Sequence, residues 1–185
     1  MKSSNYLDSI KKYFLYFIFY AVLGWCYETV LEVFIYRWGF SNRGFLFGPY
    51  LPIYGFGALA FIICLRKLKE KKIKIGSISI TPILVFLGIM GIATSIELVT
   101  SYGLQIFTGS WLWDYKSYDF NFQGRIALNP SVRFGIGGMV FMYIFQPLLD
   151  KALRNADPKK LTVIFKILVV IVAIDFLIKI GNMIF

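Results

Sequence analysis

The sequence has no histidine and only two cysteines among its 185 residues. Without histidine, the chain can form neither a Ser-His-Asp or Cys-His catalytic group nor an HExxH zinc helix. Cys26 and Cys64 lie alone in separate apolar segments, so we expect them to pack as small apolar side chains rather than to hold zinc. The sequence therefore predicts no metal site and no cofactor.

Charged residues are also scarce. Only 16% of the residues are charged and 58% are hydrophobic, against about 25% and about 45–50% in soluble domains. This excess of apolar residues is too large for one soluble core, which argues against a soluble enzyme and against a secreted disulfide scaffold. No GxxxxGK[ST] run occurs, so the chain cannot hydrolyse ATP by that route.

Five stretches are long and apolar enough to form transmembrane helices, each of which needs about 20 such residues. They are Tyr13–Tyr36, Gly48–Leu65, Ser79–Phe107, Phe134–Leu149 and Thr162–Phe185. No internal repeat and no low-complexity linker separates them. We therefore predict an all-α membrane protein in which residues 1–185 form a single polytopic domain with about five transmembrane helices.

The basic residues predict how these helices are oriented. Of the 20 Lys and Arg residues, 13 lie in the N-terminal segment and in the second and fourth connections, whereas five lie in the two opposite connections. Because cytoplasmic loops are enriched in Lys and Arg, we expect the N-terminus in the cytoplasm and the C-terminus outside. The net charge of +10 then indicates topology and attraction to anionic membrane lipids rather than nucleic-acid binding.

Several polar side chains fall inside the predicted helices, where a charge costs at least about 2.5–3.5 kcal/mol on insertion scales. The third helix has one polar stripe, formed by Thr94, Glu97, Ser101 and Gln105. On the last helix, Asp175 and Lys179 are spaced to pair with each other. Glu28 and Glu97 have no basic residue at such a spacing, and both a functional role and a structural ion pair stay open for them.

The two connections predicted to lie outside are rich in glycine, proline and aromatic residues. Glycine and proline permit sharp turns in Ser41–Gly55, and Arg43 adds a planar cation. A membrane-interface belt would explain the rings of Trp111–Ile126 but not the polar residues between them. An outward-opening cavity lined by acids and arginines would satisfy both sets of charges. The candidate ligand-binding residues are Glu28, Asn42, Arg43, Glu97, Asp114, Tyr115, Asn121 and Arg125.

Several of these motifs, taken in order, resemble the Putative ABC-transporter type IV (CmpB-like) family. They are Gly24-Trp25 with Glu28, Asn42–Leu46 with Gly48-Pro49, Glu97, Trp113–Tyr115, and Asn121 with Gly124–Ile126. The resemblance covers roughly Leu15 to Leu148, so the last helix is expected to lie outside it. The family usually has a serine-tryptophan-glycine run after the arginine motif, and here Phe134 replaces the tryptophan. It implies a small, multi-pass protein of the bacterial plasma membrane with a permease-like role and no named substrate.

Three functions fit these observations. The first, which the motifs and the resemblance favour, is a permease-like subunit that binds a small polar or anionic ligand in an outward-facing pocket and works with a separate ATPase or another membrane subunit. The second is an intramembrane enzyme acting on a lipid or cell-envelope precursor, with Glu28 or Glu97 as acid or base and Arg43 and Arg125 holding a phosphate. The third is a non-catalytic assembly or regulatory subunit.

Overall fold

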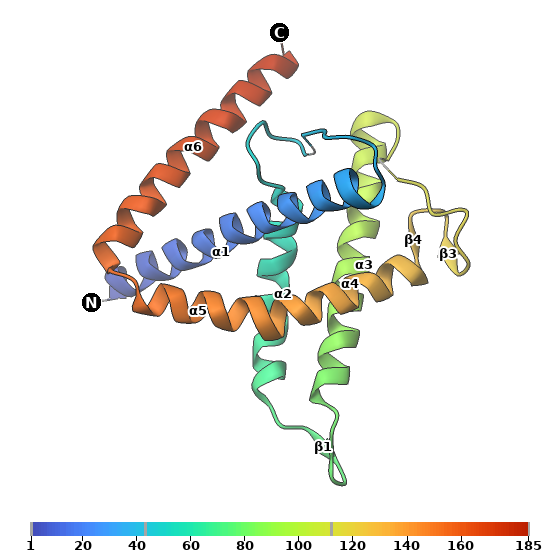
Figure 1. Ribbon diagram of the computed structural model, residues 1–185, viewed down its shortest axis with the longest axis horizontal. Helices are drawn as coiled ribbons and strands as arrows, with labels where there is room; N and C mark the ends of the chain where they lie inside the picture. Colours follow the sequence, from blue (N-terminus) through green and yellow to red (C-terminus); the bar gives the residue numbers. More distant parts are fainter. Residues whose placement is uncertain (1, 43, 112, 185) are drawn as a thin grey trace. The chain divides into compact units, whose positions relative to one another are not determined.

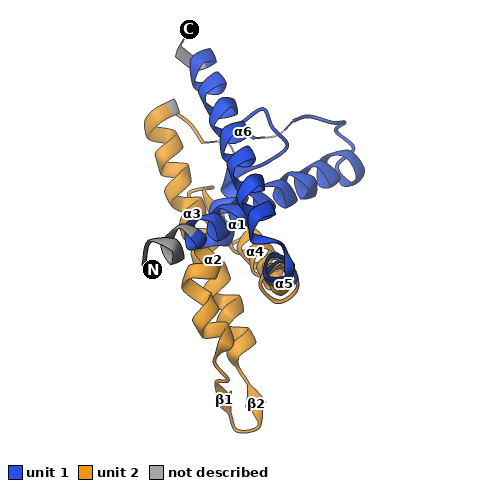
Figure 2. Ribbon diagram, turned by 90° about the vertical axis from the view of Figure 1, so that its left-hand side faces the viewer, with its two compact units in different colours: residues 1–59, 148–185 blue, residues 60–147 orange. Residues whose placement is uncertain are grey.

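The computed structural model describes residues 2–42, 44–111 and 113–184, without the side chains of residues 2–7, 108, 183 and 184. The chain divides into two compact units (Figure 2). Unit 1 contains residues 1–59 and 148–185, and unit 2 contains residues 60–147. Among the described residues both units are built from helices, apart from two short hairpins, so the predicted all-α class is confirmed.

Unit 1 is built around two long helices that meet near their starts (Figure 1). It contains α1 (Lys2–Val30), the π-helix η1 (Leu31–Ile35) that continues it, the first half of α2 (Pro52–Glu70), most of α5 (Gln146–Asn155), and α6 (Pro158–Ile184). Lys11 Nζ on α1 donates to Thr162 Oγ1 on α6 at 3.3 Å, and the rings of Phe14 and Phe165 meet edge to face at 5.2 Å. These contacts join the N-terminal halves of the two helices.

The connection between η1 and α2 folds back onto α1. The amide of Leu51 donates to the carbonyl of Ala21 at 2.9 Å, immediately before Pro52 starts α2. Ala21, Leu46 and Tyr50 form a buried cluster, against which Val172 of α6 packs. The connection is therefore part of the core of unit 1 rather than a loose loop.

Unit 2 contains the remaining elements. They are the second half of α2, the hairpin of β1 (Lys74–Ile75) and β2 (Ile78–Ser79), α3 (Thr81–Thr108), the hairpin of β3 (Asn121–Phe122) and β4 (Ile126–Ala127), α4 (Leu128–Val140), the π-helix η2 (Phe141–Phe145) and the start of α5. α3 starts with a proline in its first turn and ends at Gly109, whose φ of 79° is the left-handed conformation that glycine adopts at low cost.

Glycines let the helices of unit 2 approach one another closely. A Cβ at Gly138 of α4 would lie 2.4 Å from Ile89 Cγ2 of α3, and a Cβ at Gly135 would lie 2.5 Å from a ring carbon of Phe86. Small residues have this role at helix contacts inside membranes, where no hydrophobic effect drives the helices together. The glycine-rich run of α4 is thus a helix-packing surface.

Pro147 explains the π-helix that precedes it. Proline lacks the N–H that would bond the carbonyl four residues earlier, and its ring clashes with that carbonyl, so the helix widens in the preceding turn. Lys69 of α2 donates from Nζ to the carbonyl of Met142 at 2.5 Å and lies over the ring of Tyr143. A side chain therefore bonds a carbonyl of the widened turn.

Four helices of the described chain are long and apolar enough to cross a membrane: Asp8–Ile35, Thr81–Phe107, Leu128–Asn155 and Pro158–Asn182. The predicted fourth span, Phe134–Leu149, was too short, because α4, η2 and α5 form one continuous run. α2 is not among the four, since its last turns carry Arg66, Lys67 and Lys69. Most large apolar side chains of α6 are exposed, as expected for a lipid-facing helix. The chain is a multi-pass membrane protein, and the count of five spans stays a prediction.

Candidate functional site

In unit 2 the connection between α3 and α4 folds into a compact structure of its own. Its hairpin turns at Gln123 and Gly124, whose φ angles are 55° and 68°. The carbonyl of Gly124 accepts the amide of Tyr115 at 2.8 Å. Asn121 holds the same turn, because its Oδ1 accepts the amide of Gly124 at 3.0 Å and its Nδ2 donates to the carbonyl of Tyr118 at 2.8 Å. The side chains on either side of the turn are thereby fixed.

Arg125 fastens this connection to α3. The residue is only 4% exposed, and its guanidinium carbon lies 4.1 Å from the centroid of the Tyr102 ring and 4.0 Å from that of Trp111. Nη1 donates to Ser101 Oγ at 3.3 Å, and Nη2 donates to Gln105 Oε1. Stacking and forked hydrogen bonding of this kind suit the planar guanidinium of arginine.

Glu97 lies one turn before Ser101 on the same face of α3. Its Oε1 accepts the hydroxyl of Tyr115 at 2.7 Å. Its Oε2 is buried without a hydrogen-bond partner among the described residues, and Arg125 Nε is in the same state. Buried polar atoms are nearly always bonded, so one such atom on α3 and one of opposite charge on the connection packed against it are unusual. We call Glu97, Ser101, Gln105, Tyr115 and Arg125 the α3 site.

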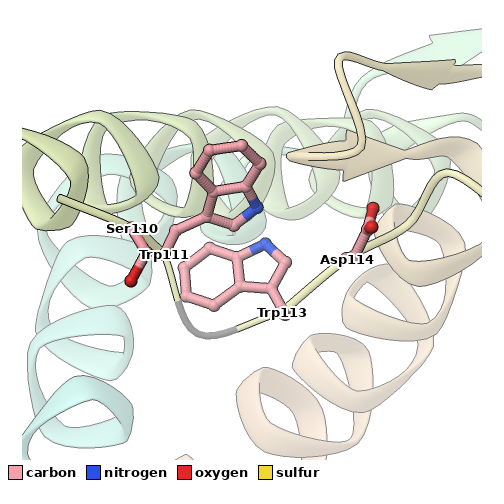
Figure 3. Close-up of a pocket in the computed structure, with 4 residues that line it drawn as sticks. All are labelled: Ser110, Trp111, Trp113 and Asp114. Atoms are coloured by element: carbon pink, nitrogen blue, oxygen red, sulfur yellow. The ribbon is translucent and has the colours of Figure 1, made fainter.

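A hollow of about 380 Å³ adjoins the α3 site and is open to the surface. It is lined by Ser110, Trp111, Trp113 and Asp114, and Figure 3 shows the Trp111 ring above the Trp113 ring in that view, with Asp114 further along the segment. Trp113 donates from Nε1 to the carbonyl of Arg125 at 2.7 Å. Trp111, whose ring covers the guanidinium of Arg125, forms another part of the wall of the hollow.

Asp114 binds within its own segment rather than to an arginine. Its Oδ1 accepts the amide of Lys116 at 2.9 Å, and its Oδ2 lies 3.7 Å from Lys116 Nζ. Both side chains are more than half exposed, so this ion pair contributes little to stability. The carboxylate of Asp114 therefore stays exposed where it lines the hollow.

The predicted site residues of unit 1 contact other partners. Glu28 accepts a hydrogen bond from the hydroxyl of Tyr54, which lies in the first turn of α2. Asn42 accepts Trp25 Nε1 at 2.8 Å on its Oδ1 and donates from Nδ2 to the carbonyl of Phe47 at 2.7 Å. Arg43 lies outside the described residues. A cavity that joins these residues to the α3 site stays a prediction of the sequence.

Asp175 has partners that its spacing from Lys179 did not predict. Its carboxylate accepts the amides of Phe47 and Gly48 at 3.0 and 2.8 Å, and the hydroxyl of Tyr50. Lys179 Nζ lies over the rings of Phe45 and Phe47, 5.5 and 5.1 Å from their centroids. The carboxylate therefore hydrogen-bonds the connection between η1 and α2, and Lys179 of its own helix adds a nearby positive charge.

Sequence reasoning also missed the two ring contacts of Arg125 and the role of Glu32. Glu32 is 4% exposed, and its Oε1 accepts the hydroxyl of Ser41 at 2.6 Å. The only signal was a second acid four residues after Glu28. Within the described part of the chain no cluster of three His, Cys, Asp or Glu side chains could hold a metal ion.

Comparison with known protein families places this chain in a group of related sequences. A family model described as Putative ABC-transporter type IV matches residues 15–180. The match includes most of α6, so the expectation that the last helix lies outside the shared region was wrong. No curated protein and no solved structure matches the chain.

Proposed function

The chain belongs to the Putative ABC-transporter type IV family, and on this basis we propose that it is a permease-like integral membrane subunit of the bacterial plasma membrane. In this proposal the α3 site holds a small polar or anionic ligand in an outward-facing pocket. Four helices suited to crossing a bilayer and the exposed apolar faces of α6 support the setting, in which membrane lipids surround the protein.

One observation supports the ligand site above all others. Glu97 Oε2 and Arg125 Nε are buried and have no hydrogen-bond partner in the described part of the chain, although both side chains are otherwise well bonded. Leaving such an atom unpaired costs about 1–3 kcal/mol, and more for a charged group, so a site with a purely structural role is expected to pair them. A polar ligand with one acceptor and one donor satisfies both atoms.

The energy source in this proposal is a separate ATPase chain, because the sequence contains no Walker A pattern. Its docking surface is the basic connection between α2 and α3. Thr81 stiffens this connection, since its Oγ1 accepts the amide of Ile73 at 2.9 Å and donates to the carbonyl of Lys71 at 2.7 Å. The exposed lysines of the connection are Lys71, Lys72 and Lys74.

Two measurements test the proposal. Crosslinking in native membranes followed by purification is expected to recover an ATPase, and membrane vesicles are expected to take up a member of a panel of labelled small polar solutes. Glu97→Gln is expected to abolish uptake, because the carbonyl oxygen still accepts from Tyr115 while the charge is lost.

Asp8→Asn is the matched control, since Asp8 is exposed on α1 and pairs with Lys11 of the same helix. It is expected to leave uptake unchanged. Failure to recover any ATPase, together with no uptake of any solute in the panel, would overturn the proposed function.

A further inference from the structure

The segment Phe47–Tyr50 of unit 1 is held in a fixed shape before α2 begins. Asn42 Nδ2 donates to the carbonyl of Phe47 at 2.7 Å, and Asn42 is itself held by Trp25. The amide of Tyr50 donates to the carbonyl of Gly48 at 2.8 Å, which closes a tight turn across Pro49. The backbone donors of this segment are therefore preorganised.

Three donors of this segment converge on one place. They are the amides of Phe47 and Gly48 and the hydroxyl of Tyr50, and all three donate to the carboxylate of Asp175. The two amides divide between the two oxygens, with Phe47 on Oδ1 and Gly48 on Oδ2. Neighbouring backbone amides that point to one spot form anion-binding concavities in proteins. We call these three donors the carboxylate cradle.

The chemistry of the cradle does not depend on the side chain that fills it. Burial raises the pKa of the Tyr50 hydroxyl above its ordinary value, so it stays protonated and remains a donor. Lys179 adds a positive charge at the rim, over the rings of Phe45 and Phe47. Two amides, one phenol and one ammonium group suit any carboxylate that reaches them.

The cradle is partly open. The hydrogen bond from the Phe47 amide is exposed and Asp175 is partly exposed, whereas the Tyr50 side chain is buried. The start of α6 is fixed independently by Thr162 and Phe165, about ten residues or 15 Å along the helix. Release of Asp175 therefore leaves the contact between α1 and the start of α6 in place.

We propose that the carboxylate cradle is a binding site for small-molecule carboxylates and that Asp175 closes it as an internal ligand. A free carboxylate takes the place of Asp175 on the two amides and the Tyr50 hydroxyl, and α6 then loses its hydrogen bonds to Phe47–Tyr50 while Val172 keeps its packing contact. The cradle lies in unit 1 and involves no residue of the α3 site, so this inference stands apart from the proposed function.

The test compares acetate with chloride at matched concentrations on the purified full-length protein. Asp175→Ala empties the cradle while keeping its donors, and it is expected to lower the midpoint of thermal unfolding. Sodium acetate is expected to restore that midpoint, whereas sodium chloride is not. Asp8→Ala removes an exposed carboxylate from α1 and controls for general effects of acetate. The midpoint of thermal unfolding of this variant is expected to be the same in acetate and in chloride.

Binding of labelled acetate gives the second readout. Asp175→Ala is expected to bind acetate on the order of tenfold more tightly than the wild type, because the tethered Asp175 competes at a high effective concentration. The double variant Asp175→Ala with Tyr50→Phe is expected to lose most of this gain. If Asp175→Ala does not fold, Asp175→Ser empties the cradle of its carboxylate and replaces it in both measurements.

Equal effects of acetate and chloride, or acetate binding to the variant no tighter than to the wild type, would overturn the inference and leave Asp175 as a structural contact only. Neither result bears on the recovery of an ATPase or on solute uptake, so the two proposals fail separately.

Discussion

At the scale of single residues, Arg125 decides whether the connection from α3 to α4 keeps its shape. We expect Arg125→Lys to lower the free energy of unfolding by about 2 kcal/mol, because lysine loses the ring stacking and cannot fork to Ser101 and Gln105. Thermal unfolding in detergent measures the change. Arg133→Lys is the control, since Arg133 is exposed on α4, and an equal loss in both variants would contradict the role given to Arg125.

The same residue shows how far the sequence alone leads. The steps of three and four residues along the third helix correctly placed Glu97, Ser101 and Gln105 on one face, because helical periodicity is a local property. The rings that cover Arg125 could not be predicted in the same way. Trp111 lies in a part of the connection that is neither helix nor strand, and its contact with Arg125 depends on the turn at Gln123 and Gly124.

At the scale of elements, the contact between α3 and α4 rests on glycine. We expect Gly138→Ala to destabilise the protein by about 1–3 kcal/mol, because the new Cβ would lie 2.4 Å from the Cγ2 atom of the fully buried Ile89. A β-branched side chain cannot move that methyl group without leaving its rotamer. Chemical or thermal unfolding of the purified variant gives the measurement.

Gly137→Ala is the neighbouring control on the same helix. No atom lies within 4 Å of a Cβ at Gly137, so we expect this variant to be neutral or to gain up to about 1 kcal/mol from reduced freedom of the unfolded chain. If Gly137→Ala costs as much as Gly138→Ala, the close approach of Gly138 to Ile89 does not explain the loss of stability.

Element boundaries illustrate what apolar runs can and cannot predict. The runs correctly indicated the first, third and last long helices, since length and apolarity are read directly from the sequence. They misplaced the fourth, because the charged residues of α5 end the apolar run while the helix continues to Asn155. The sequence also did not predict that Asp175 accepts the amides of Phe47 and Gly48. The spacing of Asp175 and Lys179 on one helix indicated Lys179 as the partner instead.

At the scale of the whole molecule, the distribution of basic residues predicts which connections face the cytoplasm. In a background with Cys26→Ser and Cys64→Ser, we expect an impermeant maleimide to label Ser117→Cys on intact cells. Ser77→Cys, at the turn between β1 and β2, is expected to react only after the membrane is opened. Both positions are exposed, so accessibility within the protein does not limit the reaction. The reverse pattern would invert the topology.

The side of the membrane on which α6 ends distinguishes a chain with four membrane spans from one with five. If α2 crosses the membrane despite its charged last turns, Asn182→Cys lies outside and reacts on intact cells in the same cysteine-free background. We expect this result, because the apolar half of α2 precedes its basic end as in a helix that stops at the cytoplasmic surface. Protection of Asn182→Cys in intact cells would limit the chain to four spans.

The most direct test of the central claim is a high-resolution density map of the full chain, purified from its native membrane with any ATPase partner. The account predicts density between Glu97 and Arg125, within hydrogen-bonding distance (about 3 Å) of Glu97 Oε2 and Arg125 Nε. It predicts that Glu97→Gln removes this density without disturbing the stack of Arg125 on Trp111. A map in which protein side chains alone bond both atoms, with no further density between them, would contradict the claim that the α3 site holds a ligand.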